Sequence, residues 1–298
     1  MYTRFYGLKE IPFGLTPNPK YIFKTDSYLE VIANLRYCIS HYKGIVTVTG
    51  EVGTGKTTTL RSMIQQLGHE VLAVYILNPF LTVPEFYEQL TSSLRLGLSP
   101  RASKPEILNT LACFLSQRHM KGLRTVLIAD EAHGLSPTVL EEIRLLANLE
   151  TNTEKLFQIV LCGQPELRET LNQPGLRQLK QRISLRCSIK PLSTDEVTKY
   201  IRFRLRTAGA ERMDIFDSSA LGLIARVSLG IPRVVNNICD NALLQGYAVN
   251  SEVISRDIIE DVIEVLDIST NDMTTSDDLE FNQWSSPKHF TAIEGSRS

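Results

Sequence analysis

The chain has 298 residues, of which 43% are hydrophobic, and it carries 32 Lys and Arg against 33 Asp and Glu. This length allows one large domain or two smaller ones with a substantial buried core. The near-zero net charge excludes a uniformly basic nucleic-acid coat protein and a highly acidic disordered chain. Charge is nevertheless uneven, because residues 267–298 hold six acids and two bases, whereas residues 168–206 hold ten bases and three acids.

Cysteine spacing and the N-terminus both argue against secretion. The five cysteines are far apart and form neither a CxxC pair nor a metal-ligand pattern with histidine, which favours a reducing compartment without disulfides or structural zinc. The N-terminus has no apolar signal-peptide core, and no stretch approaches the roughly 18 apolar residues of a membrane helix. We therefore expect a cytoplasmic protein with no transmembrane span.

Short apolar runs rich in β-branched residues predict five strands, over residues 45–49, 71–77, 125–129, 158–162 and 184–189. The first four are continuous rather than alternating. This pattern is typical of strands buried on both faces, as in a parallel sheet covered by helices. The sequence therefore predicts an α/β domain over residues 44–190.

Helical patterns follow the strands and dominate after residue 191. Ser136-Pro137 predicts a helix start before an amphipathic run over residues 139–149, and Ser193 opens a capping box for a helix to about Thr207. Three more helices are predicted over residues 218–227, 232–248 and 255–265. We expect a small all-α domain over residues 191–266, preceded by an N-terminal segment and a first helix over residues 1–43.

Residues 267–298 are rich in Ser, Thr and Asp and hold the single tryptophan. Their low apolar density predicts a disordered acidic tail, because too little surface can be buried to offset the entropy of ordering. The alternative interpretation is a short docking peptide around Leu279, Phe281 and Trp284.

A complete GxxxxGK(S/T) motif lies between the first strand and a predicted helix. Its glycines let successive backbone N–H groups face a phosphate, and the helix N-terminus adds partial positive charge. Lys56 is expected to reach the β- and γ-phosphates of a nucleotide, and the Thr57 hydroxyl to ligate Mg²⁺. The predicted nucleotide-binding residues are Gly50, Glu51, Val52, Gly53, Thr54, Gly55, Lys56, Thr57 and Thr58.

The third strand ends in two acids, Asp130 and Glu131. Adjacent residues at a strand end point in different directions, so Asp130 can hold the Mg²⁺ shell while Glu131 activates the attacking water. The pair favours hydrolysis over simple binding. Residues 130–133 also spell the DEAH of one helicase class. Such helicases need a second α/β domain, whereas the residues after 191 are expected to form helices and a tail, and we interpret His133 as a local polar contact.

Further polar residues are candidates for sensing or stabilising the γ-phosphate. Gln164 follows the fourth strand, where its amide can contact the phosphate or the water. Phosphoryl transfer also calls for a cation beyond the P-loop lysine. Arg182 is the first candidate for an arginine acting on a neighbouring subunit, followed by Arg177 and Arg186; the alternative is a solvated or DNA-contacting basic face over residues 168–206.

Arg233 lies in the first turn of a predicted helix, after Gly230-Ile-Pro. A cation is unfavourable at this end of a helix unless an anion is close. Nucleotide phosphate is the anion that we expect there.

The order and spacing of these motifs resemble the AAA+ ATPases of the ExeA/GspA secretion and MshM pilus-biogenesis subgroup, over about residues 1–265. The resemblance implies a P-loop NTPase fold with a five-stranded parallel sheet, helices on both faces and a small all-α lid. It also implies a Walker A motif at residues 50–57, a Walker B pair at Asp130 and Glu131, sensor 1 at Gln164, an arginine finger near Arg182 and sensor 2 at Arg233. The segment around residues 13–23 is implied to pack beside adenine.

This resemblance predicts an oligomeric ATPase, as a hexamer-like ring or a filament, that uses ATP and Mg²⁺ to assemble or remodel secretion or pilus machinery, in the cytoplasm or at the inner face of the cell membrane. ExeA/GspA proteins carry a membrane span and a peptidoglycan-binding region after the ATPase, and the chain is nearer the shorter MshM form. A more distant resemblance to TnsC-type transposition regulators leaves the alternative of an ATP-dependent DNA-binding protein that recruits a transposase.

Overall fold

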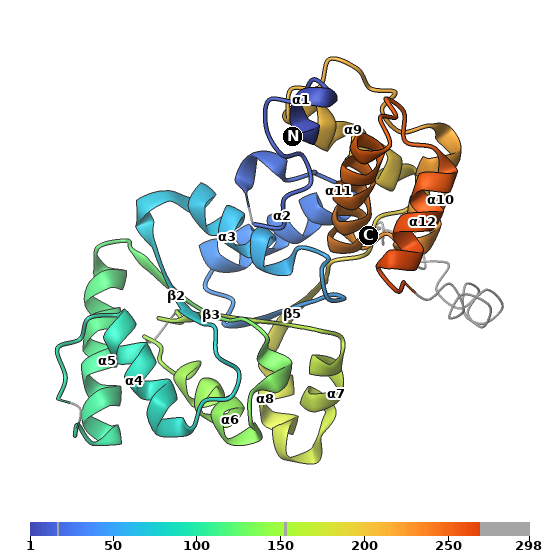
Figure 1. Cartoon of the computed structure of the whole chain (residues 1–298). Coiled ribbons are helices and arrows are strands. Elements are labelled where there is room, and N and C mark those ends of the chain that lie inside the picture. The colour runs from blue at the N-terminus through green and yellow to red at the C-terminus, as the bar shows by residue number, and fades with distance from the viewer. Residues whose placement is uncertain (17, 100, 152–153, 269–298) are drawn as a thin grey trace, which may run out of the picture.

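The computed structural model describes residues 1–16, 18–99, 101–151 and 154–268. A five-stranded, fully parallel sheet lies at its centre (Figure 1), in the order β2-β3-β4-β1-β5. The fold class expected from the sequence is therefore confirmed. The strands are β1 (Ile45–Thr49), β2 (Val71–Ile76), β3 (Arg124–Ala129), β4 (Gln158–Gly163) and β5 (Ile183–Ser188).

Helices cover both faces of this sheet, as the continuous apolar runs predict. One face packs against α2 (Asp26–Ser40) and α3 (Lys56–Leu67). The other carries α4 (Val83–Ser93), α5 (Lys104–Met120), α6 (Pro137–Leu146), α7 (Glu166–Asn172) and α8 (Arg177–Gln181). The expectation that β2 is buried on both sides is wrong: β2 is an edge strand, and Leu72, Ala73 and Tyr75 are partly exposed.

Four helices form the lid that follows the sheet, namely α9 (Thr194–Thr207), α10 (Ser218–Val227), α11 (Pro232–Ala248) and α12 (Arg256–Val265). The capping box expected at the start of α9 is present, because the Ser193 hydroxyl accepts from Glu196 N and the Glu196 carboxylate accepts from Ser193 N. Short 3-10 turns complete the described elements at Pro19–Tyr21 (η1), Gly68–Glu70 (η2), Ala132–Gly134 (η3) and Pro174–Leu176 (η4).

The N-terminus packs on the lid rather than on the sheet. Helix α1 (Tyr2–Phe5) lies against α11, and Tyr2 donates a hydrogen bond to Asp240 Oδ1 at 2.5 Å. Tyr6, Phe13 and Tyr21 belong to the same hydrophobic cluster as the lid helices. The chain then continues to α2 on the sheet, so the segment before α2 connects the two parts of the molecule (Figure 1). We call residues 12–16 and 18–25 the N-terminal strap.

The predicted tail lies outside the described residues from position 269 onward. Within the described part of the chain, no helix is long and apolar enough to cross a bilayer.

Candidate nucleotide-binding site

The loop between β1 and α3 has the backbone that the phosphate-loop motif predicts. Gly53 and Gly55 have φ values of +83° and +92°, in the left-handed region that favours glycine. A Cβ on Gly50 would lie 2.7 Å from the carbonyl oxygen of Ile189, so only glycine fits there. The loop therefore curls tightly and leads directly into the first turn of α3, which is the arrangement that presents backbone N–H groups to an anion.

Lys56 begins α3 and is buried. Its Nζ donates to the carbonyl oxygens of Gly50 at 2.9 Å and Glu51 at 3.1 Å. The ammonium group is thus held at the mouth of the loop, within reach of phosphate oxygens that would compete with these carbonyls.

Thr57 and Asp130 are brought together from elements 73 residues apart. The Thr57 hydroxyl donates to Asp130 Oδ2 at 2.6 Å, and Asp130 is buried at the carboxyl end of β3. Hydroxyl and carboxylate oxygens are hard donors of the kind that Mg²⁺ prefers, and Mg²⁺ in nucleotide sites completes its shell with water and phosphate oxygens. The described residues contain no cluster of three His, Cys, Asp or Glu side chains that would hold a metal alone, so the Thr57–Asp130 pair fits Mg²⁺ only as part of a nucleotide complex.

Glu131 adopts a strained backbone, with φ at +51°. Such a conformation is uncommon for a non-glycine residue and clusters at functional sites. Its N–H donates to Asp130 Oδ1 at 3.0 Å, whereas its own Oε2 is buried without a hydrogen-bond partner among the described residues. The side chain as a whole is 44% exposed and lines the cavity, so the rest of the carboxylate is open to water and suits a group that accepts a proton from it.

His133 lies between the Walker B glutamate and the expected sensor glutamine. Its Nδ1 is 3.5 Å from Glu131 Oε2, and its Nε2 is 3.1 Å from Gln164 Nε2. Gln164 N also approaches Nδ1 at 3.4 Å. The histidine thus makes a local polar contact, and it joins the ends of β3 and β4.

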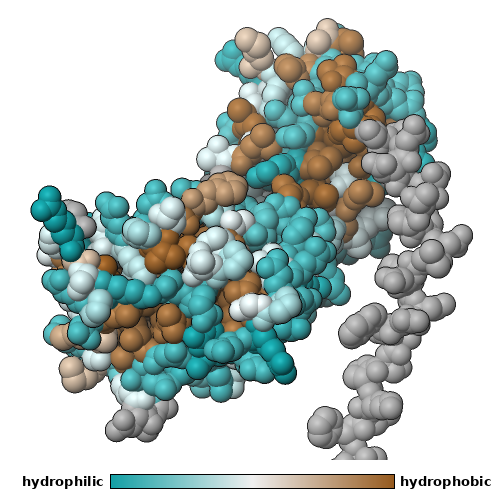
Figure 2. All heavy atoms as spheres, turned by 90° about the horizontal axis from the view of Figure 1, so that it is seen from below, coloured by the Kyte–Doolittle hydropathy of each residue, from teal (hydrophilic) through white to brown (hydrophobic). Residues whose placement is uncertain are grey.

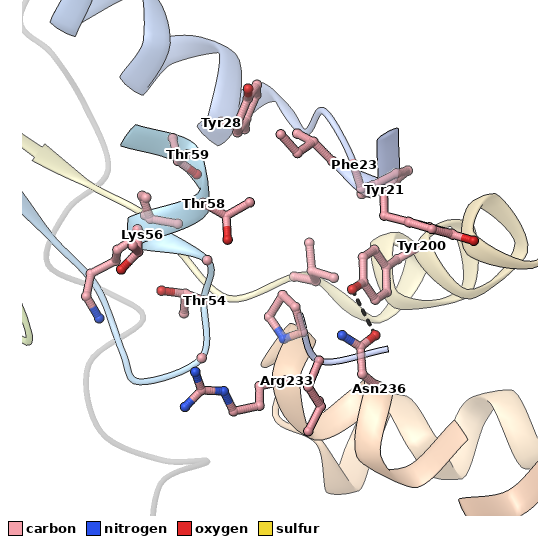
Figure 3. Close-up of a pocket in the computed structure, with 18 of the residues that line it drawn as sticks. Tyr21, Phe23, Tyr28, Thr54, Lys56, Thr58, Thr59, Tyr200, Arg233 and Asn236 are labelled. Atoms are coloured by element: carbon pink, nitrogen blue, oxygen red, sulfur yellow. Dashed lines mark hydrogen bonds between the residues drawn. The ribbon is translucent and has the colours of Figure 1, made fainter. Parts of the chain in front are cut away.

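A cavity of about 390 Å³ runs from the P-loop to the lid. Figure 3 shows Lys56 at one end and Tyr21, Tyr200 and Asn236 at the other. The lining residues come from the N-terminal strap and α2 (Gly14, Leu15, Thr16, Asn18, Tyr21, Ile22, Phe23, Thr25, Tyr28), the P-loop and α3 (Val52 to Thr59, Arg61), the Walker B glutamate (Glu131), the linker after β5 (Ile189, Lys190, Leu192), and the lid (Tyr200, Arg204, Pro232, Arg233, Asn236).

The strap thus flanks this cavity. The resemblance implies that the segment around residues 13–23 packs beside adenine, but not every residue of that segment lines the cavity. Tyr21, Ile22 and Phe23 line the cavity. Phe13 does not; it is 1% exposed and packs edge-to-face on Phe216 in the lid core. Core packing is therefore the role of Phe13.

Arg233 is placed at the phosphate end by a direct contact between α11 and the P-loop. Its N–H lies 3.3 Å from the carbonyl oxygen of Gly53, and a Cβ on Gly53 would approach Arg233 Cβ to 2.7 Å. Figure 3 shows the exposed guanidinium extending toward the loop.

The three arginines expected to act on a neighbour do not line the cavity of their own chain. Arg177 begins α8, Arg182 follows it and Arg186 lies on β5, and all three are exposed. A fourth arginine from the basic segment is nearer the P-loop: Arg168 Nη2 donates to Thr49 Oγ1 at 3.2 Å.

Several lid residues that line the cavity belong to no sequence motif, and they were not predicted from the sequence. Tyr200, Arg204 and Asn236 come from α9 and α11 and are buried together. Burial raises the pKa of the Tyr200 phenol, although the neighbouring Arg204 acts in the opposite direction. The one sequence signal was an arginine on the apolar face of α9, where a charged residue is unusual.

The fold is a P-loop fold of the AAA type. A family model described as an AAA domain matches residues 39–171. Among solved structures, Cdc6p from Pyrobaculum aerophilum superposes with a TM-score of 0.67 at 18% identity, covering 85% of this chain and 70% of that one, a likeness that shows the fold alone.

Two groups of proteins are similar to the chain in sequence. The chain is 45% identical over 254 residues to general secretion pathway protein A of Aeromonas hydrophila, which covers 85% of this chain and 46% of that protein. It is 29% identical over 130 residues to the ATP-dependent target DNA activator B of Escherichia phage Mu, covering 44% and 39% respectively. The alignments thus span less than half the length of these relatives. The resemblance to the ExeA/GspA subgroup, and the more distant one to transposition ATPases, are confirmed.

Proposed function

We propose that the chain is an oligomeric ATPase that hydrolyses ATP with Mg²⁺ and uses this cycle to assemble or remodel a secretion or pilus complex. One observation carries the chemical part of the proposal: the P-loop, Thr57 and Glu131 line one cavity, and the Thr57 hydroxyl donates to Asp130 beside it. The identity to general secretion pathway protein A supports the choice of partner.

In this mechanism, the loop N–H groups and Lys56 would hold the β- and γ-phosphates, and Thr57 and Asp130 would hold Mg²⁺. When bound, Mg²⁺ supplies charge neutralisation between the two phosphates. Glu131 orients the attacking water and accepts its proton on the carboxylate. Gln164 and His133 fix the groups around that carboxylate, while Arg233 approaches the phosphates from the lid.

We infer an oligomer, as a ring or a filament, from the position of the candidate arginines. Arg182, Arg177 and Arg186 are exposed beside edge strand β5 and away from the cavity of their own chain. An arginine that stabilises charge on the γ-phosphoryl group is therefore supplied most directly by another subunit. We take Arg182 as the first candidate.

Exposed apolar surface on the lid supports assembly with other chains. Figure 2 shows apolar side chains gathered on this part of the molecule. Leu244 and Tyr247 of α11 and Val265 of α12 line a groove there, and they are 51%, 38% and 79% exposed. Apolar surface of this kind is typical of protein contacts.

The site of action that we propose is the cytoplasm or the inner face of the cell membrane.

A second candidate function is an ATP-dependent DNA-binding regulator of transposition. It is favoured by the relationship to the phage target DNA activator and by the excess of basic residues over positions 168–206. DNA affinity that requires ATP and falls steeply with salt would support this candidate. Absence of DNA binding at low salt would leave the secretion or pilus assignment.

The proposed chemistry is tested with the purified chain and its Lys56→Ala variant. The wild type should turn over ATP with Mg²⁺ and stop when Mg²⁺ is chelated. Loss of the Lys56 ammonium should reduce ATP affinity at least about tenfold, because a charge-assisted contact to phosphate is lost. Lys43→Ala, an exposed lysine before β1, is the control and should behave as wild type. Unchanged ATP binding by Lys56→Ala would contradict the proposed site.

A further inference from the structure

The end of the cavity away from the P-loop is lined by polar groups of the lid. Tyr200 and Arg204 of α9 and Asn236 of α11 lie there, and each is less than 8% exposed. Because the P-loop takes phosphates at the opposite end, this end is the place for the base of a nucleotide. It is also the end that carries side-chain hydrogen-bonding groups rather than only apolar surface.

The hydrogen bonds among these three side chains have a defined direction. Arginine can only donate, and Arg204 Nη1 donates to the Tyr200 hydroxyl at 2.7 Å. The hydroxyl proton is then directed to Asn236 Oδ1, at 2.9 Å. Burial raises the pKa of Tyr200, so the phenol keeps the proton that it donates. The amide of Asn236 is therefore oriented by its network, with Oδ1 toward Tyr200.

This orientation leaves the Nδ2 amino group of Asn236 as an outward donor. It has no hydrogen-bond partner in the described part of the chain, and Figure 3 shows it on the side of the cavity that leads to the P-loop. Asn236 is also three residues after Arg233 on α11, so the two side chains share one helix face. One face of α11 thus places Arg233 at the P-loop end of the cavity and Asn236 at the lid end.

Arg204 is fixed from its other side by the N-terminal strap. Its Nε donates to the carbonyl oxygen of Pro12 at 2.6 Å, and its Nη2 donates to that of Gly14 at 3.2 Å. The guanidinium also lies over the Tyr21 ring, 4.6 Å from its centroid. These contacts fix the position of Arg204, which donates to Tyr200. They also supply the acceptors without which burial of the guanidinium cation would be costly.

We propose that Asn236 reads the base of the bound nucleotide, donating from Nδ2 to a ring-nitrogen acceptor of the purine, with Tyr200 and Arg204 as positioning residues. This inference rests on the proposed binding of ATP. It assigns base recognition to the lid, so that recognition of the base and approach of Arg233 to the phosphates depend on the same helix.

The first test is ATP binding by Asn236→Asp, measured by calorimetry beside wild type. The variant keeps the shape and the acceptor for Tyr200 but replaces the outward donor with an acceptor, so ATP should bind at least about tenfold more weakly. Asn237→Asp changes the adjacent residue in the same way and should bind as wild type. Equal ATP affinity of wild type and Asn236→Asp would overturn the inference, whereas failure of the wild type to bind ATP would overturn the proposed function instead.

The second test separates base recognition from a structural effect. Wild type, Asn236→Asp and Tyr200→Phe are compared with ATP and with its 1-deaza, 3-deaza and 7-deaza analogues, in each of which a CH replaces one ring nitrogen. One analogue should bind wild type about tenfold more weakly than ATP does, and that penalty should vanish in Asn236→Asp and shrink in Tyr200→Phe, which releases the amide. Equal penalties in all three proteins, or no penalty in wild type, would overturn the inference.

Discussion

At the scale of single residues, the site is organised by a few buried polar contacts between strand ends. Asp130 accepts hydrogen bonds from the Thr57 hydroxyl and the backbone N–H of Glu131, and Glu131 Oε2 accepts none from the described residues. His133 lies beside that oxygen and also contacts Gln164. These contacts fix the side chains to which we assign Mg²⁺, the attacking water and the phosphate, and hydrolysis requires such groups to be held in place.

The position of His133 predicts a specific kinetic effect. His133→Ala removes the side chain between Glu131 and Gln164, so the carboxylate and the amide lose a common contact. We expect kcat for ATP to fall about 10- to 100-fold with little change in KM, because small misplacements of a catalytic group have effects of this size.

The matched control for this substitution is His119→Ala. His119 is another imidazole near a carboxylate, with Nε2 3.3 Å from Glu154 Oε2, and it does not line the cavity. Steady-state ATPase rates of both variants provide the measurement. Equal kcat for His133→Ala and wild type would show that Glu131 and Gln164 are held without the histidine.

At the scale of elements, the start of α11 is positioned by the turn that precedes it. Gly230 has φ at +70°, and its carbonyl oxygen accepts a hydrogen bond from Leu192 N at 2.8 Å. A Cβ on Gly230 would lie 1.9 Å from the carbonyl oxygen of Leu192. This turn therefore locks the β5–α9 linker against α11 and sets the approach of Arg233 to the P-loop.

We predict that Gly230→Ala destabilises the protein by about 3 kcal/mol, from the left-handed backbone and the collision with Leu192. The melting temperature should fall by roughly 6–12 °C. The variant should also bind ATP more weakly, because Arg233 moves with α11.

Gly222→Ala is the control for the glycine substitution. Gly222 lies within α10, and a Cβ there would meet nothing within 4 Å. An alanine should raise stability by roughly 0.5–1 kcal/mol through helix propensity. Thermal melts of the two variants would contradict the account if Gly230→Ala unfolded at the temperature of wild type.

Much of this level of structure could be predicted from the sequence. The central strands are short continuous apolar runs, and each predicted strand lies within about one residue of the observed bounds. The helix over residues 139–149 ends earlier, at Leu146, because its cap is followed by a turn rather than by another helical residue. Burial of β2 was overestimated, since apolar pattern alone does not distinguish an edge strand from a central one.

The base end of the cavity could not be predicted in the same way. Arg204 and the strap carbonyl of Pro12 are 192 residues apart, and no periodicity or motif joins them. The phosphate end was predictable because its residues lie in one contiguous motif and at strand ends, which a parallel sheet brings to one edge. Phe13 and Tyr21 carry the same kind of signal in the sequence, and only the packing separates a core residue from a lining residue.

At the scale of the whole molecule, the cavity is shared by the strap, the sheet and the lid, while the candidate arginines Arg177, Arg182 and Arg186 are exposed and do not line it. This arrangement predicts that a complete active site contains two chains. It also leaves the exposed Arg177, Arg182 and Arg186 accessible to a neighbour, and the DNA-binding alternative assigns the exposed bases of residues 168–206 to a polyanion.

A mixing experiment tests the contribution of Arg182 to a neighbouring site. Arg182→Ala and Lys56→Ala should each have little ATPase activity alone. A mixture should recover part of the activity, because an intact P-loop of the first variant is completed by Arg182 of the second.

Arg212→Ala provides the control for this experiment, since Arg212 is an exposed lid arginine paired with Asp214 and Glu252. Its ATPase rate should match wild type. Absence of recovery in the mixture, with both variants folded and associating normally, would exclude Arg182 as an arginine acting in trans.

The measurement that tests the central claim most directly is ATP turnover by Glu131→Gln. The substitution keeps the size of the side chain and leaves Lys56, Thr57 and Asp130 in place, but removes the carboxylate that accepts the proton of water. The account predicts ATP affinity close to that of wild type and turnover reduced at least about 100-fold. Turnover equal to that of wild type would contradict the assignment of Glu131 and with it the proposed hydrolysis at this site.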